Sequence, residues 1–371
     1  MSRDLGSAED GTAPDRGVAA SEDGAADRPG APAGRGWAAA ARGAWRRPAV
    51  RLVVGLLISA AFLAVTVSHV DLGETARALE GAAPGGILLA LALVLVELLI
   101  RAERWRILLH ASAPVPFRSA FAYLTVGYFA NLLLPARLGD VTRAYLSGRS
   151  FGISPLVTLG TIVVERVSDT AVILVVVLAA GLAIAPGSEV AGWAEVLAVV
   201  AVIGLAVAVV VGVGVVRCGL LDRRYGRQVR AILARVAQGG AALGRPSGAA
   251  LVLGLTVLPF GVAVCTFGAV ASALGLSLDP IQWALVLGVL ALSTAIPAAP
   301  GSLGTYEFAG VTVLGILGIG SSQALAATVL IHVLATVPSA LLGLAATLVL
   351  HVRIRDIEAT GTVPAGVTAD G

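Results

Sequence analysis

Apolar residues in this chain gather into long runs that are separated by short polar segments. Six runs are long enough to form membrane-spanning helices, which need about 20 residues each. They lie at about 50–70, 85–109, 155–186, 190–216, 248–275 and 322–350. Two shorter runs, at about 119–135 and 281–298, each lead into a segment rich in Pro and Gly. The pattern predicts an all-α polytopic membrane protein in which the two shorter runs need a separate explanation.

The distribution of Arg indicates how the two shorter runs are placed. Cytoplasmic loops of membrane proteins carry an excess of basic residues. If both short runs crossed the membrane, the Arg-rich segment 217–247 would lie outside, whereas if both re-enter it lies inside with the other Arg clusters. We therefore expect six spanning helices plus two re-entrant hairpins in the cell (plasma) membrane, with both termini cytoplasmic. Counting apolar runs alone would give eight spans.

Composition divides the chain into three parts. Overall, 57% of the residues are hydrophobic and 13% are charged, which excludes an ordinary soluble domain. Residues 1–48 have few large apolar side chains, so we expect a disordered cytoplasmic tail. Residues 49–350 form the predicted transmembrane domain, and 351–371 form a short cytoplasmic tail. Within the domain, the basic cytoplasmic loop 217–247 has the pattern of an amphipathic helix on anionic lipid.

The second half of the chain resembles the first at an offset of about 165 residues, and the order of the spans makes the two copies inverted. Pro135–Asp140 resembles Pro300–Thr305, and 152–167 resembles 318–333. Inverted repeats with broken helices are a feature of transporters. Glu165 would then lie about 15 Å into its helix, near the bilayer centre. The alternative is a chance match, because Gly- and Ala-rich apolar sequence aligns with itself readily.

Charged residues interrupt the apolar pattern at 131–143 and again at 165–169. Ionisable side chains within a membrane are costly and mark functional sites by default. On a helix, Glu165 and Asp169 share a face, and Arg166 can also meet Asp169. The candidate substrate-binding residues are Asn131, Arg137, Asp140, Arg143, Glu165, Arg166, Asp169 and Glu307.

Two interpretations of this cluster stay open. It can form a polar groove in which Arg contacts the phosphate of a lipid headgroup through a forked pair of hydrogen bonds. It can instead be a structural cluster of ion pairs that fixes the first hairpin to the next helix. In either case one Arg between two carboxylates leaves a surplus negative charge, which Arg137 or Arg143 would match if the hairpin packs beside this helix. His332, alone in an apolar helix, is either a hydrogen-bonded core residue or a titrating group.

Signals for enzymatic chemistry are weak. The segment Gly148–Gly152 matches the pattern of a nucleophile elbow but follows no predicted strand. No Walker A, zinc or Cys-rich metal motif occurs, so we expect no catalytic residues, metal or cofactor. One enzyme alternative is a polyprenyl-phosphate-dependent glycosyltransferase that uses Asp71 and Glu74, in the first outer loop, as catalytic carboxylates. Basic residues lie next to the predicted membrane, so we expect lipid rather than nucleic acid as their partner.

Four segments carry a resemblance to a known family. Residues 101–109, 131–140, 164–169 and 300–307 resemble, in this order, the lysylphosphatidylglycerol synthase transmembrane-region family, also called the flippase-like or UPF0104 family. The resemblance covers about 50–350 and implies a membrane domain that flips aminoacylated phosphatidylglycerol or, in other members, is tied to polyprenyl-linked sugars. The chain ends soon after its last apolar run, so we expect no aminoacyl-transferase domain and no synthase activity.

Together these observations predict a non-enzymatic, flippase-like membrane protein. Its expected partners are membrane lipids: an anionic or aminoacylated phospholipid, or a polyprenyl-linked lipid. A rival hypothesis from another class is a non-transporting scaffold for a cell-envelope enzyme, which would bind that enzyme as a partner. The sequence does not indicate the oligomeric state, the direction of transport or its energy source.

Overall fold

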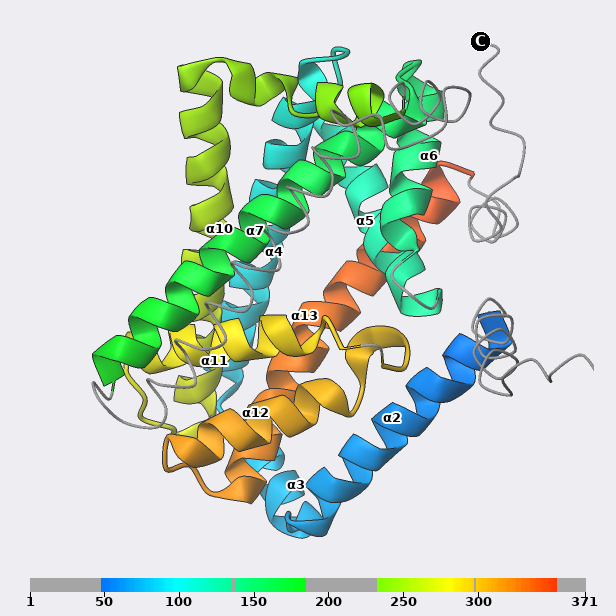
Figure 1. Cartoon of the computed structure of the whole chain (residues 1–371). Helices are drawn as coiled ribbons and strands as arrows, with labels where there is room; N and C mark the ends of the chain where they lie inside the picture. Colours follow the sequence, from blue (N-terminus) through cyan, green and yellow to red (C-terminus); the bar gives the residue numbers. More distant parts are fainter. Residues whose placement is uncertain (1–47, 135–137, 185–231, 297, 352–371) are drawn as a thin grey trace, which may run out of the picture. The chain divides into compact units, whose positions relative to one another are not determined.

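The structure, a computed structural model, describes residues 48–134, 138–184, 232–296 and 298–351, all within the unit Arg47–Gly371. Regular structure in these residues is entirely helical (Figure 1). The longer helices are α2 (Pro48–Ser68), α4 (Pro84–His110), α7 (Pro155–Ile184), α10 (Pro246–Leu274) and α13 (Ser321–Val349). The shorter elements are α3 (Leu72–Glu80), α5 (Phe117–Leu133), α6 (Gly139–Phe151), α11 (Pro280–Ser293), α12 (Thr305–Ile316), a helical segment at 232–238 and the 3-10 turns η2 (Ala241–Gly244) and η3 (Pro300–Ser302).

Pro and Gly mark many of the helix ends. Pro84, Pro246 and Pro280 stand in the first turn of α4, α10 and α11, where the missing N–H has no helical partner to lose. Gly152 and Gly275 end α6 and α10 in the left-handed conformation that glycine adopts without strain. The apolar runs therefore form helices, and Pro and Gly in the sequence determine where many of these helices begin and end.

Four helices, α4, α7, α10 and α13, are long and apolar enough to cross a membrane by length and composition. The pair α2 and α3 makes a fifth candidate, with a bend of 85° between its helices. These findings confirm the predicted all-α class for the described residues. The apolar run 190–216, residues 217–231 of the basic loop and nearly all of both predicted tails lie outside the described residues.

Two pairs of short helices turn back on themselves between the long ones. Near the start of α5 and the end of α6, the Tyr123 hydroxyl lies 2.5 Å from Ser150 Oγ, and at the other end Gly139 N–H donates to Asn131 Oδ1 over 2.8 Å. α5 and α6 therefore run antiparallel. α11 and α12 also contact each other and are joined by a second turn, residues 298–304 in the described part. The two pairs enter from opposite ends of the long helices (Figure 1).

The sets α4–α7 and α10–α13 share one order: long, short, short, long. α4 packs antiparallel to α10, where Ala83 N–H donates to the Ala273 carbonyl over 2.8 Å and Arg104 reaches Thr256 near the other end. Neighbours correspond as well: α5 of the first set contacts α13, and α11 of the second contacts α7. Each short pair therefore packs against the last long helix of the opposite set.

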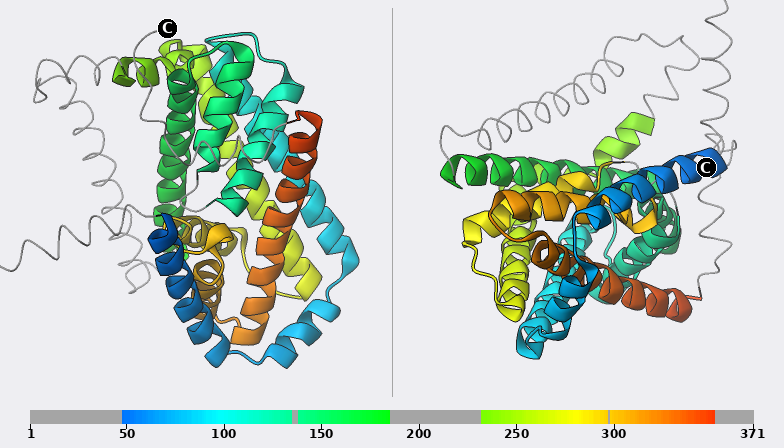
Figure 2. Two further views of the ribbon diagram at one scale, coloured as in Figure 1. Left: turned by 90° about the vertical axis from the view of Figure 1, so that its right-hand side faces the viewer. Right: turned by 90° about the horizontal axis from the view of Figure 1, so that it is seen from below.

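The second turn is held by elements from distant parts of the sequence. Gly301 packs against the side chain of Leu132, near the end of α5. Ser59 Oγ of α2 accepts a hydrogen bond of 2.8 Å from Ala299 N–H. Figure 2 shows α2, in dark blue, beside the segment that contains α12, and the two helices are in contact. The end of α5, the second turn and α2 therefore meet.

Candidate functional site

Two carboxylates lie buried on one face of α7. Glu165 and Asp169 are separated by four residues, which places them one above the other on a helix. Arg104 of α4 bridges them: its Nη1 donates to Asp169 Oδ1 over 2.5 Å, and its Nη2 lies 3.3 Å from Glu165 Oε1. Only 2% of the Arg104 side chain is exposed. A third hydrogen bond joins Arg104 Nη1 to Thr256 Oγ1 of α10, so this residue ties three long helices together.

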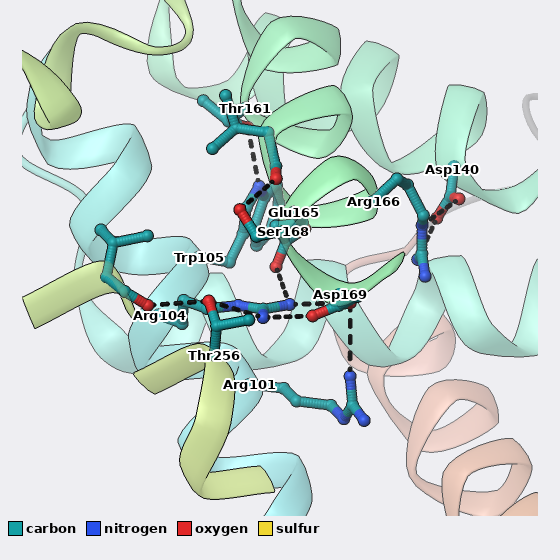
Figure 3. Close-up of polar contacts among 12 residues, drawn as sticks. Arg101, Arg104, Trp105, Asp140, Thr161, Glu165, Arg166, Ser168, Asp169 and Thr256 are labelled. Atoms are coloured by element: carbon teal, nitrogen blue, oxygen red, sulfur yellow. Dashed lines mark hydrogen bonds and ion pairs between the residues drawn. The ribbon is translucent and has the colours of Figure 1, made fainter. Parts of the chain in front are cut away.

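These groups belong to a continuous series of ion pairs, which we call the charge chain. Acidic and basic side chains alternate along it. Figure 3 shows six of its members: Arg101, Arg104, Asp140, Glu165, Arg166 and Asp169. In order, the members are Glu97, Arg101, Asp169, Arg104, Glu165, Arg143, Asp140 and Arg166, with successive N–O distances of 2.7, 3.7, 2.5, 3.3, 2.6, 4.0 and 3.2 Å. Four positive charges are matched by four negative ones.

Balance of charge explains how the chain can lie in an apolar interior. An isolated buried ion is strongly disfavoured, whereas paired ions recover much of that cost through mutual attraction and hydrogen bonds. Each inner member has a partner on either side, so removing one would leave two neighbours incompletely paired. The arrangement therefore predicts that the inner charges act as a unit.

Arg143 is enclosed by aromatic and acidic partners. Its Nη2 donates to Glu165 Oε2 over 2.6 Å, and its guanidinium lies 4.4 Å from the centre of the Trp105 ring. The Trp105 indole N–H donates to Thr161 Oγ1 of α7 over 3.0 Å, which fixes the ring under the cation. Because 1% of the Arg143 side chain is exposed, this residue supports the site from inside.

The charge chain reaches the surface at Arg166. Its Nε and Nη2 each donate to one carboxylate oxygen of Asp140 over 3.2 Å, a forked pairing of Arg with carboxylate. The exposed fraction of its side chain is 44%, the highest in the charge chain. Asp140 stands in the first turn of α6, directly after the first hairpin turn. An accessible guanidinium and a carboxylate thus lie side by side, next to the buried ion pairs of the charge chain.

The first turn is closed by Asn131 and Gly139. Asn131 Oδ1 accepts the N–H of Gly139, the residue that begins α6. A side chain at Gly139 would collide with the carbonyl oxygen of Gly127, so only glycine lets α6 approach α5 this closely. This contact places Asp140 and Arg143 against α7.

A second polar cluster lies in the other set of helices. Glu307 Oε2 accepts from Gly304 N–H over 2.6 Å, as in a capping box at the start of α12. Its other oxygen, Oε1, lies 2.6 Å from His332 Nδ1 on α13, and His332 Nε2 lies 2.9 Å from the Gly301 carbonyl oxygen. The Tyr306 ring packs on the imidazole, with 4.3 Å between the ring centres. The cluster joins α12, α13 and the second turn.

The predicted site residues divide between these two clusters. Seven of the eight are described, and Glu307 belongs to the second cluster while Asn131 closes the first turn. Arg137 lies outside the described residues. Of the two Arg residues expected to match the surplus negative charge, Arg143 is described, and it pairs with Glu165. Arg166 pairs with Asp140 rather than with Asp169, the partner that its sequence spacing allowed.

Sequence reasoning missed how Arg104 and Arg101 take part. Glu97 and Arg101, four residues apart on α4, form a local pair at 2.7 Å, but Arg101 also reaches Asp169. Arg104 was not assigned to the site at all, and the available signal was its place within 101–109, one of the four segments that carry the family resemblance. Asp71, the carboxylate of the enzyme alternative, accepts the N–H of Glu74 and caps α3.

Comparison with known proteins adds two relatives, both from archaea. Over 354 residues, the chain is 28% identical to a protein named "Glycosyltransferase AglD" from Haloferax volcanii, a match that covers 82% of this chain and 55% of that protein. It is also 28% identical over 122 residues to "UPF0104 membrane protein MJ1595" from Methanocaldococcus jannaschii, covering 32% of this chain and 36% of that protein. Each match spans less than two thirds of the relative's own length.

The family comparison is broader. The model of a family described as "Lysylphosphatidylglycerol synthase TM region" matches residues 52–343, which include both polar clusters and all of the long helices except the ends of α2 and α13. This agrees with the resemblance carried by the sequence motifs and with the four apolar helices of spanning length. The chain therefore belongs to the lysylphosphatidylglycerol synthase TM region family and is a multi-pass membrane protein.

Proposed function

We propose that this protein is a lipid flippase that binds a charged lipid headgroup at Arg166 and Asp140 and moves it across the membrane without altering it chemically. Its substrate would be an anionic or aminoacylated phospholipid, or a polyprenyl-linked lipid. The observation that carries the proposal is the charge chain, which is buried in its central part and ends at one accessible Arg.

The proposal includes a topology. Six spanning helices, one of them in the segment 190–216, enclose two re-entrant hairpins, α5–α6 and α11–α12, that form an inverted repeat with both termini cytoplasmic. Support comes from the equivalent neighbours of the two helix sets and from the contact of Leu132 with Gly301, which brings the end of one hairpin to the turn of the other. Helices of 17 residues or fewer are short for a span when each is taken alone.

The pairing of Arg166 with Asp140 suits a headgroup that carries both charges. A lipid phosphate can take the place of the Asp140 carboxylate on Arg166, because the guanidinium fork fits both groups. Asp140 is then free to pair with the ammonium group of an aminoacyl substituent. One internal ion pair is thereby exchanged for two pairs with the lipid, so neither Arg166 nor Asp140 is left unpaired.

The inner part of the charge chain has a supporting role in this scheme. Arg143 and Arg104 neutralise Glu165 and Asp169 and hold α4, α6 and α7 in fixed positions. A rigid base of this kind keeps Asp140 and Arg166 aligned while lipid binds, and rigid positioning is what a specific site requires. The buried Arg residues would not contact the headgroup themselves.

Lipid movement in proteoliposomes tests the proposal. Purified protein would be reconstituted with traces of fluorescent phosphatidylglycerol, lysyl-phosphatidylglycerol or a polyprenyl-phosphate sugar, each in a separate preparation, and the outer leaflet would be bleached with dithionite. We expect bleaching beyond the outer-leaflet fraction for at least one of these lipids, which also identifies the substrate class. Bleaching equal to that of protein-free vesicles for all three lipids would reject the proposal.

A second candidate is favoured by one comparison. The relative named as a glycosyltransferase supports a role in sugar transfer. In this enzyme alternative the donor would be a polyprenyl-phosphate sugar, and Asp71 and Glu74 would be the carboxylates. Transfer of radiolabelled sugar to an acceptor by the purified protein, lost in Asp71→Asn, would favour this enzyme over the flippase. The scaffold hypothesis predicts instead that a cell-envelope enzyme co-purifies in fixed ratio and that no lipid moves.

A further inference from the structure

The hydrogen bonds around His332 determine how many protons the Glu307–His332 pair holds. The carbonyl oxygen of Gly301 can only accept, so His332 Nε2, 2.9 Å away, must carry a hydrogen. Between His332 Nδ1 and Glu307 Oε1, at 2.6 Å, a second hydrogen is required, because two lone pairs at this distance repel. The other Glu307 oxygen accepts from Gly304 N–H and cannot supply it. The pair therefore holds one proton more than a neutral imidazole and a free carboxylate.

Loss of that proton breaks the cluster at a defined place. With one ring hydrogen left, His332 can donate to only one of its two partners, and the other contact becomes repulsive. The ionised Glu307 carboxylate is a stronger acceptor than the Gly301 carbonyl, so the hydrogen stays on Nδ1 and the contact with Gly301 is lost. Gly301 belongs to the second turn, where its φ is +77°, and the His332–Gly301 hydrogen bond is a link from that turn to α13. If this bond is lost, the second turn is released from α13 while Glu307 still caps α12.

From this geometry we propose that Glu307 and His332 form a proton-binding site that locks the second turn onto α13 when protonated and frees it when the proton leaves. One proton passes from the Glu307–His332 pair to water, and the pair changes from neutral overall to a single negative charge. This inference rests on the function proposed above. In that function, the proton is the ion that drives or gates lipid movement past the hairpin turns.

Other titratable groups lie on the elements that pack around this pair. On α12, the ring of Tyr306 covers the imidazole, α11 contains no charged residue, and α2 contains one, Arg51, in its first turn. α4 contributes Glu97, which is engaged with Arg101 in the charge chain. The remaining titratable groups on elements that pack against α13 or the second turn are Arg118, Tyr123 and Tyr128 of α5, Glu74, Arg77 and Glu80 of α3, Cys265 of α10, and Arg101, Glu103, Arg104, Arg106 and His110 of α4.

Exposure of the pair is low but not zero. The side chains of His332 and Glu307 are 12% and 8% exposed, so a proton can reach the pair while the hydrogen bonds stay shielded. The second turn also contacts Leu132 at the end of α5, next to Asn131 and the first turn. Movement of the second turn would therefore alter the contact between the two hairpins.

Replacement of Glu307 by Gln gives a sharp test. A glutamine amide can accept from Gly304 N–H through its oxygen and donate to His332 Nδ1 through its nitrogen. Neutral His332 then donates from Nε2 to Gly301. Every hydrogen bond of the cluster is retained in Glu307→Gln without a dissociable proton, so the lock should stay closed at any pH. His332→Leu removes the link and should leave the turn released at any pH.

The experiment measures the turn directly and needs no lipid substrate. Spin labels would be placed at Leu303→Cys, in the second turn, and Leu341→Cys, on α13, both exposed positions, in a background in which Cys218 and Cys265 are replaced by Ser. Distances would be recorded in nanodiscs at about pH 5 and about pH 9, values on either side of the range in which His usually titrates. His69→Gln, an exposed histidine at the end of α2, is the matched control.

We expect the wild type and His69→Gln to gain a second, different distance at the higher pH, and Glu307→Gln to keep the low-pH distance throughout. An unchanged wild-type distance, or a Glu307→Gln variant that shifts as the wild type does, would overturn the proposal. In proteoliposomes, the same site predicts that transport by the wild type changes roughly fivefold or more with an imposed pH gradient, and that Glu307→Gln loses this response. If the turn responds to pH but the protein moves no lipid, the proton-binding site is supported and the proposed flippase function is rejected.

Discussion

Arg166 on α7 and His332 on α13 occupy corresponding positions in the two helix sets. Each lies beside a residue 26 positions earlier, at the start of the short helix that precedes it: Arg166 pairs with Asp140, and His332 packs against Tyr306. The same framework therefore carries an ion pair in one half and an aromatic stack with a buried Glu307–His332 pair in the other. This asymmetry suggests that one half binds charge from the lipid while the other responds to protons.

Loss of Arg104 should destabilise the folded protein strongly. Arg104→Gln would leave Glu165 and Asp169 buried and short of a positive partner, and breaking a buried pair in this way costs roughly 3–5 kcal/mol. Arg106, two residues along α4, pairs with Glu103 at a more exposed position, so Arg106→Gln should cost less than about 1 kcal/mol. Thermal unfolding in one detergent, followed by tryptophan fluorescence, compares the two variants. Equal loss in both would show that the charge chain does not act as a unit.

Close approach of α5 and α6 should depend on Gly139. In Gly139→Ala, the new methyl group would collide with the Gly127 carbonyl oxygen and press against Asn131, so the first hairpin must open. We expect a lower yield of folded protein and loss of lipid movement, measured by size-exclusion chromatography and the bleaching assay. Gly254→Ala in α10 is the matched control, because no atom lies within 4 Å of its new methyl group. A Gly139→Ala variant that folds and works normally would contradict the close packing.

Labelling of single cysteines should reveal both hairpins as re-entrant. Ser112 and Arg149 flank α5–α6, and Ser277 and Ser321 flank α11–α12; all four are exposed. With Cys218 and Cys265 replaced by Ser, we expect cysteines at the first two positions to react from the cytoplasmic side and those at the last two from the outer side. A membrane-impermeant maleimide applied to right-side-out and inside-out vesicles provides the measurement. Opposite sides for Ser112→Cys and Arg149→Cys would mean that the first hairpin is a span.

Local features of the structure could be predicted from the sequence. The four-residue spacing of Glu165 and Asp169 places them on one face, and Pro and Gly after the short apolar runs mark the turns. Such features depend on neighbours in the chain, and helix geometry relates them directly. The predicted offset between the halves likewise matches the starts of α7 and α13, at Pro155 and Ser321.

Partners that are distant in the chain could not be predicted. Arg104 lies 61 and 65 residues before its two carboxylates, and no spacing rule says which helices will pack together. Arg166 directly follows Glu165, so it points about 100° away around the helix and reaches Asp140 on α6 instead of the buried face. The sequence indicates which groups are costly to bury, whereas the packing of α4, α6 and α7 decides how they are paired.

The central claim is that a lipid headgroup binds at Arg166. Its most direct test is the rate of lipid translocation in proteoliposomes by Arg166→Gln, compared with wild type and with Arg106→Gln at matched incorporation. Arg166 is the most exposed member of the charge chain, so its replacement should leave thermal stability within about 1 kcal/mol of wild type. We expect Arg166→Gln to lose translocation and Arg106→Gln to retain it. Full translocation by a folded Arg166→Gln protein would contradict the assignment of the binding site.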